Sequence, residues 1–263
     1  MALAFAAIVP HSPLLAPNIG KENLSRFALT LPALATLAAS LKEAEPDAII
    51  VLTAHGPKRA SGFVANLSPR FISDLSAFGD LVTRFEFTGS ISLPARLRER
   101  LEGQASLMLT TQENLDYAAS IALSLVQVDD HTPVLPISAG GVSLEAHAEF
   151  GRRLRDFILS EDRNIAVIAA ADFSHRLSKQ SPAGYSAKAK KLDQKIVELV
   201  SSGNIKEFSA LGAEALTDAA IEDAGTVAML LGALDGFNWP ARVLSYEYPF
   251  GVGHAVISFE PEK

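Results

Sequence analysis

Four short, uninterrupted apolar runs most constrain what this chain can fold into. They are Ala4–Val9, Ala48–Thr53, Pro133–Ile137 and Ile165–Ala170. Each run is continuous rather than alternating and rich in alanine or β-branched residues, which is typical of parallel strands covered on both faces. Amphipathic patterns of helical period occupy Leu24–Leu41, Ala118–Val126, Leu144–Leu159 and Ala187–Ser201. Together these segments predict an α/β fold, with a mostly parallel central sheet flanked by helices on both faces.

The stretch from residue 62 to residue 111 has a different pattern. Strand-like pieces separated by turn residues occupy Val64–Leu67, Val82–Phe87, Ile91–Leu93 and Leu107–Leu109. We interpret this stretch as a short antiparallel excursion beside the main sheet. Because no internal repeat or linker divides the chain, we expect a single domain over residues 1–263.

The charge balance and the absence of cysteine narrow the function. With 23 basic and 30 acidic side chains the net charge is −7, which disfavours a nucleic-acid-binding protein. A chain with no cysteine has no disulfides, thiolate zinc sites, iron–sulfur clusters or cysteine nucleophile. The apolar start lacks a positively charged leader, and no apolar run reaches the roughly 18 residues of a membrane helix. We therefore expect a cytoplasmic protein without membrane contact.

Three of the six histidines follow predicted strands. His11 comes after the first run, His55 after the second and His175 after the fourth. Ligands of α/β sheets bind beyond the carboxyl ends of the strands, so three histidines at equivalent places predict a site at that edge. Two imidazoles and one carboxylate, with coordination positions left open, suit non-haem Fe(II), and zinc accepts the same ligands.

Spacing alone does not identify the carboxylate of such a site. Five acidic residues lie near turns or element ends: Asp116, Asp172, Glu222, Asp223 and Glu247. Glu222 opens an apolar helical segment that runs to Leu234, and by spacing alone its charge is better explained as offsetting the helix dipole.

These motifs resemble one family, the class III extradiol ring-cleavage dioxygenases, typified by the catalytic B subunit of protocatechuate 4,5-dioxygenase. Each matching piece alone is weak, but their order and strand-end placement are fairly specific, and they cover essentially the whole chain. The pieces are Val9–Pro13, Thr53–Gly56, Ala171–His175, the helix that Glu222 opens, and the closing segment Ser245–His254.

The resemblance implies a role for each of four residues. His11, His55 and Glu222 match the ligands of a ferrous ion, with zinc or manganese as alternatives, and His175 matches the acid–base histidine that does not bind the metal. The implied reaction is cleavage of the aromatic ring of a catechol-type diol by O₂. We also expect a homo-oligomer, and the need for a small partner subunit, as in some relatives, stays open.

One position departs from the family pattern. Where relatives carry an Asp-His-Gly element, whose histidine contacts the substrate, this chain reads Asp116-Tyr117-Ala118. A tyrosine donates a hydrogen bond, but its pKa near 10 makes it a poor proton shuttle at neutral pH. We assign Tyr117 to the catalytic site in place of that histidine. His131 is interpreted as a solvated loop residue, and His147 is given no role.

Two other functions remain open at this point. A metal-dependent hydrolase could use the same ligands, and a Memo-like protein of the same superfamily would bind metal without ring cleavage. That second branch typically carries cysteine where Glu222 stands, so the absence of cysteine favours the dioxygenases. Lys58, Arg59 and Arg176 could hold a substrate carboxylate, although solvation in loops explains them better. The identity of the catechol is not predicted.

Overall fold

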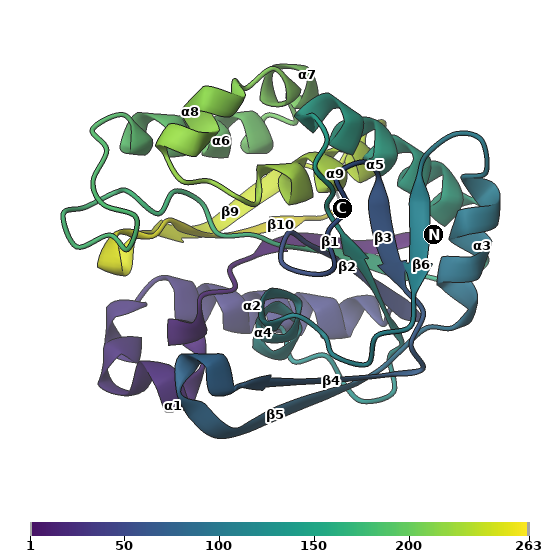
Figure 1. The fold of residues 1–263 in the computed structure, drawn as a ribbon, viewed down its shortest axis with the longest axis horizontal. Helices are drawn as coiled ribbons and strands as arrows, with labels where there is room; N and C mark the ends of the chain where they lie inside the picture. The colour runs from purple at the N-terminus through teal and green to yellow at the C-terminus, as the bar shows by residue number, and fades with distance from the viewer. Residues whose placement is uncertain (1, 262–263) are drawn as a thin grey trace.

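The four apolar runs form the parallel centre of the sheet in the computed structural model, which describes residues 2–261. Eight strands lie in the order β6-β3-β7-β2-β8-β1-β10-β9 (Figure 1). The central four are β7 (Val134–Ser138), β2 (Ala48–Thr53), β8 (Ile165–Ala170) and β1 (Leu3–Val9). The prediction of a mostly parallel α/β sheet is confirmed.

Antiparallel pairings extend this centre on both sides. The outer strands are β3 (Phe63–Asn66), β6 (Leu107–Thr110), β9 (Ala241–Glu247) and β10 (His254–Phe259). β3 runs antiparallel to β7, and β10 runs antiparallel to both β1 and β9. Because β10 is reversed, its first residue lies at the edge where the parallel strands end. This places His254 beside the segments that follow β1 and β8.

The excursion between residues 62 and 111 is only partly antiparallel. β4 (Arg70–Leu75) and β5 (Asp80–Thr88) form a separate hairpin, joined by the 3₁₀ turn η3 (Ser76–Phe78). β3 and β6, however, pair in parallel and belong to the main sheet. The predicted strand at Ile91–Leu93 is wrong, because this segment opens helix α3 (Ser92–Arg100). Three residues are too short a run to distinguish a strand from a helix start.

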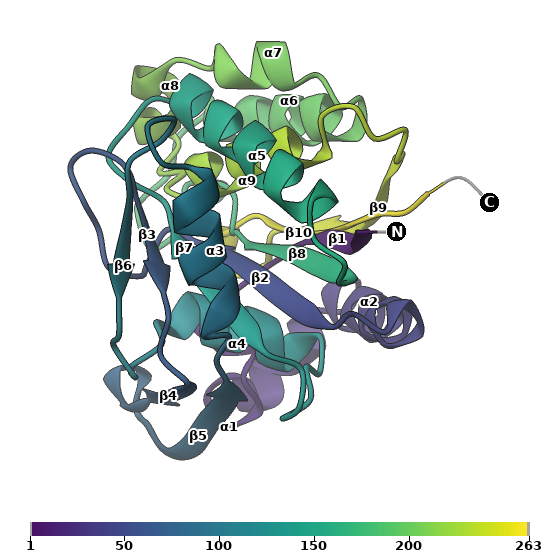
Figure 2. The same ribbon diagram turned by 90° about the vertical axis from the view of Figure 1, so that its right-hand side faces the viewer.

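Helices cover both faces of the sheet (Figure 2). The longer ones are α2 (Thr30–Ala44), α4 (Tyr117–Leu125), α5 (Leu144–Leu159), α6 (Ala189–Ser201) and α9 (Ala224–Leu234). The short ones are α1 (Pro17–Gly20), α7 (Ile205–Ser209) and α8 (Ala213–Asp218), with 3₁₀ turns at η1 (Pro13–Leu15), η2 (Lys21–Arg26) and η4 (Pro249–Gly251). Alternate residues of β2 separate the two cores: Ile49 packs with α2 and α4, whereas Ile50 packs with α5 and α9. The helix predicted from Leu24 begins later, at Thr30.

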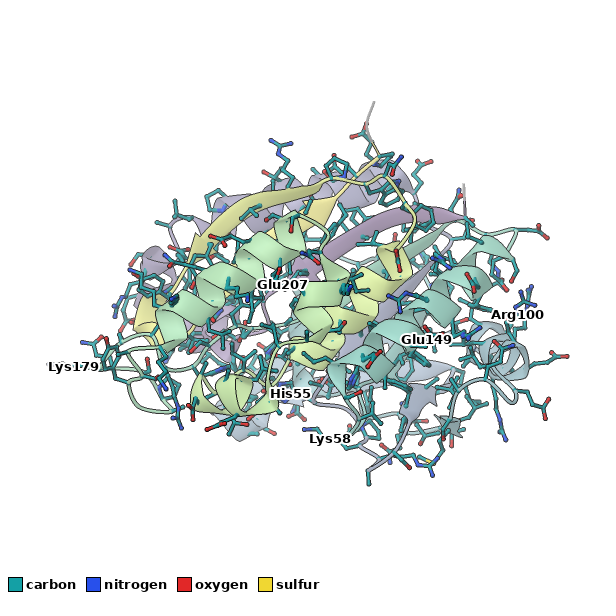
Figure 3. All side chains as sticks on the ribbon, turned by 90° about the horizontal axis from the view of Figure 1, so that it is seen from above. His55, Lys58, Arg100, Glu149, Lys179 and Glu207 are labelled. Atoms are coloured by element: carbon teal, nitrogen blue, oxygen red, sulfur yellow. The ribbon has the colours of Figure 1, made fainter. Side chains whose placement is uncertain are left out.

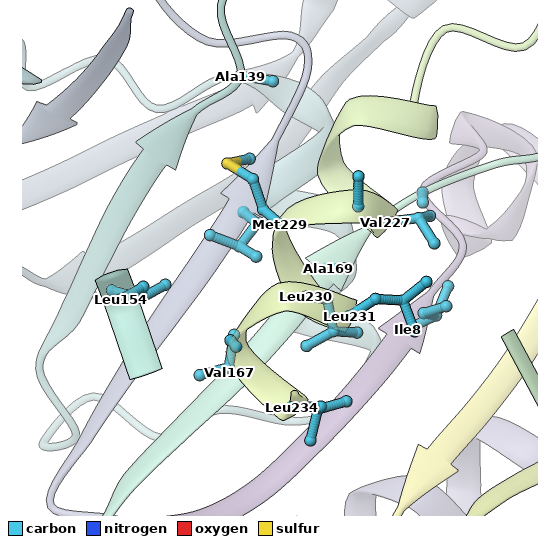
Figure 4. Packing of buried hydrophobic residues seen from close by; sticks show 14 of the residues in the cluster. Ile8, Ala139, Leu154, Val167, Ala169, Val227, Met229, Leu230, Leu231 and Leu234 are labelled. Carbon is cyan, nitrogen blue, oxygen red and sulfur yellow. The ribbon is translucent and has the colours of Figure 1, made fainter. Parts of the chain in front are cut away.

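Helix α9 lies between α5 and the sheet with its backbone against that of α5. A Cβ built on Gly151 of α5 would lie 2.1 Å from the carbonyl oxygen of Met229, and one on Gly232 of α9 would lie 2.1 Å from that of Ala148. Toward the sheet, Leu230 and Leu231 lie near Ile8 and Val167 (Figure 4). This packing fixes the position of the segment that enters α9.

No single helix within residues 2–261 has both the length and the apolar character needed to cross a membrane. The segments Pro17–Arg26 and Thr30–Ala44 meet the length and composition criterion only when taken together, and they are bent by 116° relative to each other. α9 is apolar but short, and nearly all of its side chains are buried inside the protein.

Candidate metal centre

Two of the predicted histidines converge on one buried carboxylate. The Nε2 atom of His11 lies 2.9 Å from Oδ2 of Asp223, and Nε2 of His55 lies 3.5 Å from Oδ1 of the same residue. One ligand atom from each residue can be chosen so that all three lie within 4.8 Å of one another. Figure 3 shows His55 near Lys58, which follows it in the same loop. His11 and Asp223 are buried, whereas the His55 side chain is 19% exposed. The cluster therefore has one side near solvent.

The strands explain why the histidines meet. β8 lies between β1 and β2, and Val9 of β1 is level with Ala170 of β8. β2 is in register with β8 through Leu52 and Ala169, so the three strands end at the same height. His11 and His55 are each the second residue beyond their strand, which brings both side chains to the same edge.

The carboxylate in the cluster is Asp223, the neighbour of the predicted Glu222. Asp223 is the N-cap residue of α9 and points into the protein, whereas the side chain of Glu222 is exposed. Glu222 instead lines a cavity of about 470 Å³, together with Lys58 and Arg59. A shift of one residue at a helix start turns the side chain by about 100°, enough to exchange buried and exposed positions.

The electrostatics of the cluster favour a bound cation. Burial alone would lower the pKa of His11, but Asp172 and Asp223 outweigh it and raise that pKa to about 10. Burial likewise opposes the charge of Asp223, but His11 and His55 hold its pKa down at about 2. The site thus retains a buried positive charge beside two carboxylates. A divalent cation in place of that proton would satisfy the same charges.

The donor set also fits a metal. Among buried side-chain atoms, Oδ1 of Asp223 has no hydrogen-bond partner, and such an orphaned group calls for an explanation such as an ion. Two imidazoles and one carboxylate match non-haem Fe(II) centres, and zinc accepts the same ligands. The residues present therefore fit a divalent metal ion without distinguishing iron from zinc.

Tyr117 lies next to this cluster. Its hydroxyl is 3.3 Å from Nδ1 of His55, and the two rings are 4.9 Å apart. Tyr117 is the first residue of α4, whose N-cap Asp116 accepts hydrogen bonds from Ala119 and from the Thr53 hydroxyl of β2. Burial, together with the nearby carboxylates, raises the pKa of Tyr117 above its usual value. The phenol therefore stays protonated.

His175 is not part of the three-residue cluster, but it contacts the segment that leads to Asp223. Its Nδ1 is 3.1 Å from the carbonyl oxygen of Ala220, three residues before Asp223 in the chain. Because a carbonyl only accepts hydrogen bonds, Nδ1 carries the hydrogen and Nε2 of the neutral ring keeps its lone pair. The ring is partly exposed. The catalytic role predicted for His175 is compatible with this tautomer and remains a prediction.

The remaining histidines differ sharply in their surroundings. His131 is exposed in the loop before β7, as predicted. His147 is buried on α5, with its Nδ1 2.8 Å from the Ser143 carbonyl and its ring edge against Phe63. His254, which the sequence did not single out, is almost completely buried and lies 3.0 Å from Asp172. Its position depends on the direction of β10, for which the local sequence carries no signal.

A buried carboxylate on helix α6 is expected to make the stability of the protein depend on pH. Burial raises the pKa of Asp193 on α6 to about 6, above its ordinary 3.8, although hydrogen bonds from Tyr246 and the Ser174 amide act in the opposite direction. Between pH 4 and pH 6 the folded protein therefore holds a proton that the unfolded chain has lost, so stability falls as pH rises through this window. Asp193→Asn removes that loss.

Between pH 4 and pH 7 we expect the unfolding free energy of the wild type to fall by about 2 kcal/mol more than that of Asp193→Asn. Urea unfolding at several pH values measures it. If the stability of the wild type and of Asp193→Asn changed with pH in the same way, Asp193 would have the same pKa in the folded and the unfolded protein, and the prediction would be wrong.

Comparison with known proteins identifies the class to which this protein belongs. Residues 5–257 match the family described as "Catalytic LigB subunit of aromatic ring-opening dioxygenase". The match spans nearly the whole chain, and the protein belongs to this family. The resemblance inferred from the sequence motifs is thereby confirmed.

Two similar proteins were compared individually. Protein CA_C1420 of Clostridium acetobutylicum is 24% identical over 264 residues, which cover 96% of this chain but 56% of that protein. The chain thus spans little more than half the length of this relative. The crystal structure of the uncharacterized protein JW3007 from Escherichia coli K12 superposes with a TM-score of 0.71 at 18% identity, covering 98% of this chain and all of that one. This second likeness establishes the shared fold alone.

Proposed function

We propose that this protein is an Fe(II)-dependent extradiol dioxygenase that cleaves the ring of a catechol-type substrate with O₂. The observation that carries the proposal is the His11, His55 and Asp223 cluster at the sheet edge of a chain from the LigB family. Ferrous iron, when bound, would supply the coordination positions at which a diol and O₂ react. His11, His55 and Asp223 would hold it.

His175 would move the proton. Nδ1–H is engaged with the Ala220 carbonyl, so the ring is oriented and Nε2 is free to accept a hydroxyl proton from the diol. The protonated ring can then return that proton later in the reaction.

Tyr117 would donate a hydrogen bond rather than transfer a proton. Its raised pKa keeps the hydroxyl protonated, which excludes action as a base near neutral pH. If Nδ1–H of His55 donates to the phenol oxygen, the phenol hydrogen is free to point at a substrate oxygen. The tyrosine thus orients His55 and substrate together.

The proposal is tested by anaerobic purification with Fe(II), metal analysis and oxygen uptake with a panel of catechols. We expect about one iron per chain and O₂ consumption with a yellow ring-opened product. Turnover of an ester or amide without O₂ would instead support the metal-dependent hydrolase. Stable metal binding without turnover of any diol would support the Memo-like alternative. Size-exclusion chromatography of the same sample tests the proposed homo-oligomer.

Replacement of His175 separates proton transfer from metal binding. We expect His175→Ala to retain full metal occupancy and to lose roughly 100-fold or more in kcat, the usual contribution of a positioned acid–base group. Metal analysis and oxygen uptake on the same preparation measure both quantities. Unchanged turnover, or loss of the metal, would contradict the assigned role.

A further inference from the structure

We propose that Asp172, held in place by His254, is a positioning residue that fixes both His11 and Asp223 for metal binding. The inference rests on the proposed metal site, and it assigns a task to two buried polar residues that the reaction itself does not use. Asp172 is the second residue beyond β8, the strand between those that lead to His11 and His55. Asp172 therefore lies at the edge where the parallel strands end, between the segments that carry His11 and His55.

Asp172 contacts both of the proposed ligands. Its Oδ1 accepts a hydrogen bond from the backbone N–H of His11 at 3.1 Å, and its Oδ2 lies 3.6 Å from Nδ1 of the same histidine. Its own backbone N–H donates to Oδ2 of Asp223 at 3.0 Å. A single residue thus links the segment after β1 to the N-terminus of α9, two parts of the chain more than 200 residues apart.

The side chain of Asp172 also selects the tautomer of His11. Nε2 of His11 faces Asp223, so a ligand electron pair at Nε2 requires the hydrogen to stay on Nδ1. The negative Oδ2 of Asp172 faces that Nδ1 and favours the hydrogen there. His55 has the same arrangement, with Tyr117 near its Nδ1. Outer partners of this kind orient metal-binding histidines and strengthen their binding.

His254 holds Asp172 in this position. Its Nδ1 lies 3.0 Å from Oδ1 of Asp172, and both side chains are almost completely buried. A carboxylate only accepts hydrogen bonds, so Nδ1 of His254 donates. The His254 ring also lies near Phe27, with ring centres 5.4 Å apart. Because His254 and Asp172 are both buried, Asp172 cannot rotate away from His11 without losing a buried hydrogen bond.

The test measures Co²⁺ binding to the full chain, by competition with a chelator and by the visible absorption spectrum of bound Co²⁺. We expect Asp172→Asn to weaken Co²⁺ binding 10- to 100-fold, the usual effect of removing such a partner, and to shift the spectrum. Asp193→Asn is the matched control, since Asp193 is another buried carboxylate that hydrogen-bonds Ser174 and Tyr246. We expect it to bind Co²⁺ as the wild type does.

Two variants of His254 test the hydrogen bond from His254 to Asp172 even if Asp172→Asn does not fold. The amide nitrogen of His254→Asn can replace Nδ1 as donor, so this variant should stay within about threefold of wild-type affinity. His254→Ala removes the donor and should weaken Co²⁺ binding about tenfold with a shifted spectrum. Wild-type affinity and spectrum in Asp172→Asn, or in His254→Ala, would overturn the inference.

The same measurements keep this inference separate from the proposed function. If the wild type binds both Co²⁺ and Fe(II) but turns over no diol, the dioxygenase proposal is refuted and the positioning role of Asp172 is unaffected. A wild type that turns over catechol while Asp172→Asn binds Co²⁺ normally refutes the positioning role alone. A wild type that binds no divalent metal overturns both.

Discussion

Asp223→Asn is expected to weaken metal binding at least 100-fold, whereas Glu222→Gln is expected to leave it unchanged. Both substitutions replace a carboxylate by an amide of the same shape, and they concern adjacent residues. Asp223 lies 2.9 Å from His11 and is buried, whereas Glu222 is exposed. An amide lacks the negative charge that a divalent ion requires from this ligand set. The two variants therefore show whether Asp223 or its neighbour Glu222 is the metal ligand.

Metal analysis of the two variants after identical Fe(II) loading gives the result directly. Circular dichroism and thermal unfolding show whether each variant is folded. The opposite pattern, with metal lost in Glu222→Gln and kept in Asp223→Asn, would refute the cluster seen here and restore the residue chosen from the sequence motifs.

Gly151→Ala is expected to destabilise the protein by about 3 kcal/mol or more. On helix propensity alone the same change would stabilise α5 by about 1 kcal/mol, so the two explanations differ in sign. The added methyl group would lie 2.1 Å from the carbonyl oxygen of Met229 and 2.8 Å from the Cα atom of Gly232. These are backbone atoms of α9, and they can move only if the two helices separate.

Denaturant unfolding of Gly151→Ala compared with the wild type measures this effect. Because α9 begins next to Asp223, separation of the helices should also weaken metal binding. A variant as stable as the wild type would show that α5 and α9 are packed less closely than their glycines indicate.

The parallel centre of the sheet was predictable because burial on both faces leaves a continuous apolar run, which is a local signal. Strand-like pieces were also recognised at β3 and β6, but their place in the main sheet was not, since it depends on which neighbour each strand pairs with. The segment Ile91–Leu93 shows the same limit, because so short a segment fits a strand and a helix start equally well. The hairpin β4–β5 was predicted as an antiparallel excursion, although only the segment of β5 was recognised as a strand.

The candidate site was likewise only partly predictable from the sequence. His11 and His55 were identifiable because each stands at a fixed distance beyond a recognisable strand. The carboxylate in the cluster is Asp223 rather than the predicted Glu222, since which of the two side chains points inward depends on how α9 packs against α5 and the sheet. His254 carried no local signal, because its place at the site edge follows from the reversed direction of β10.

By itself, the sequence determined the α/β class, the family and the two histidines, since each is encoded by residue types at short spacing. Only the tertiary structure decided that Asp223 completes the cluster and that Asp172 and His254 stand behind it. Those contacts join segments 51 to 212 residues apart. They form through strand order and helix packing, and no short stretch of sequence specifies either.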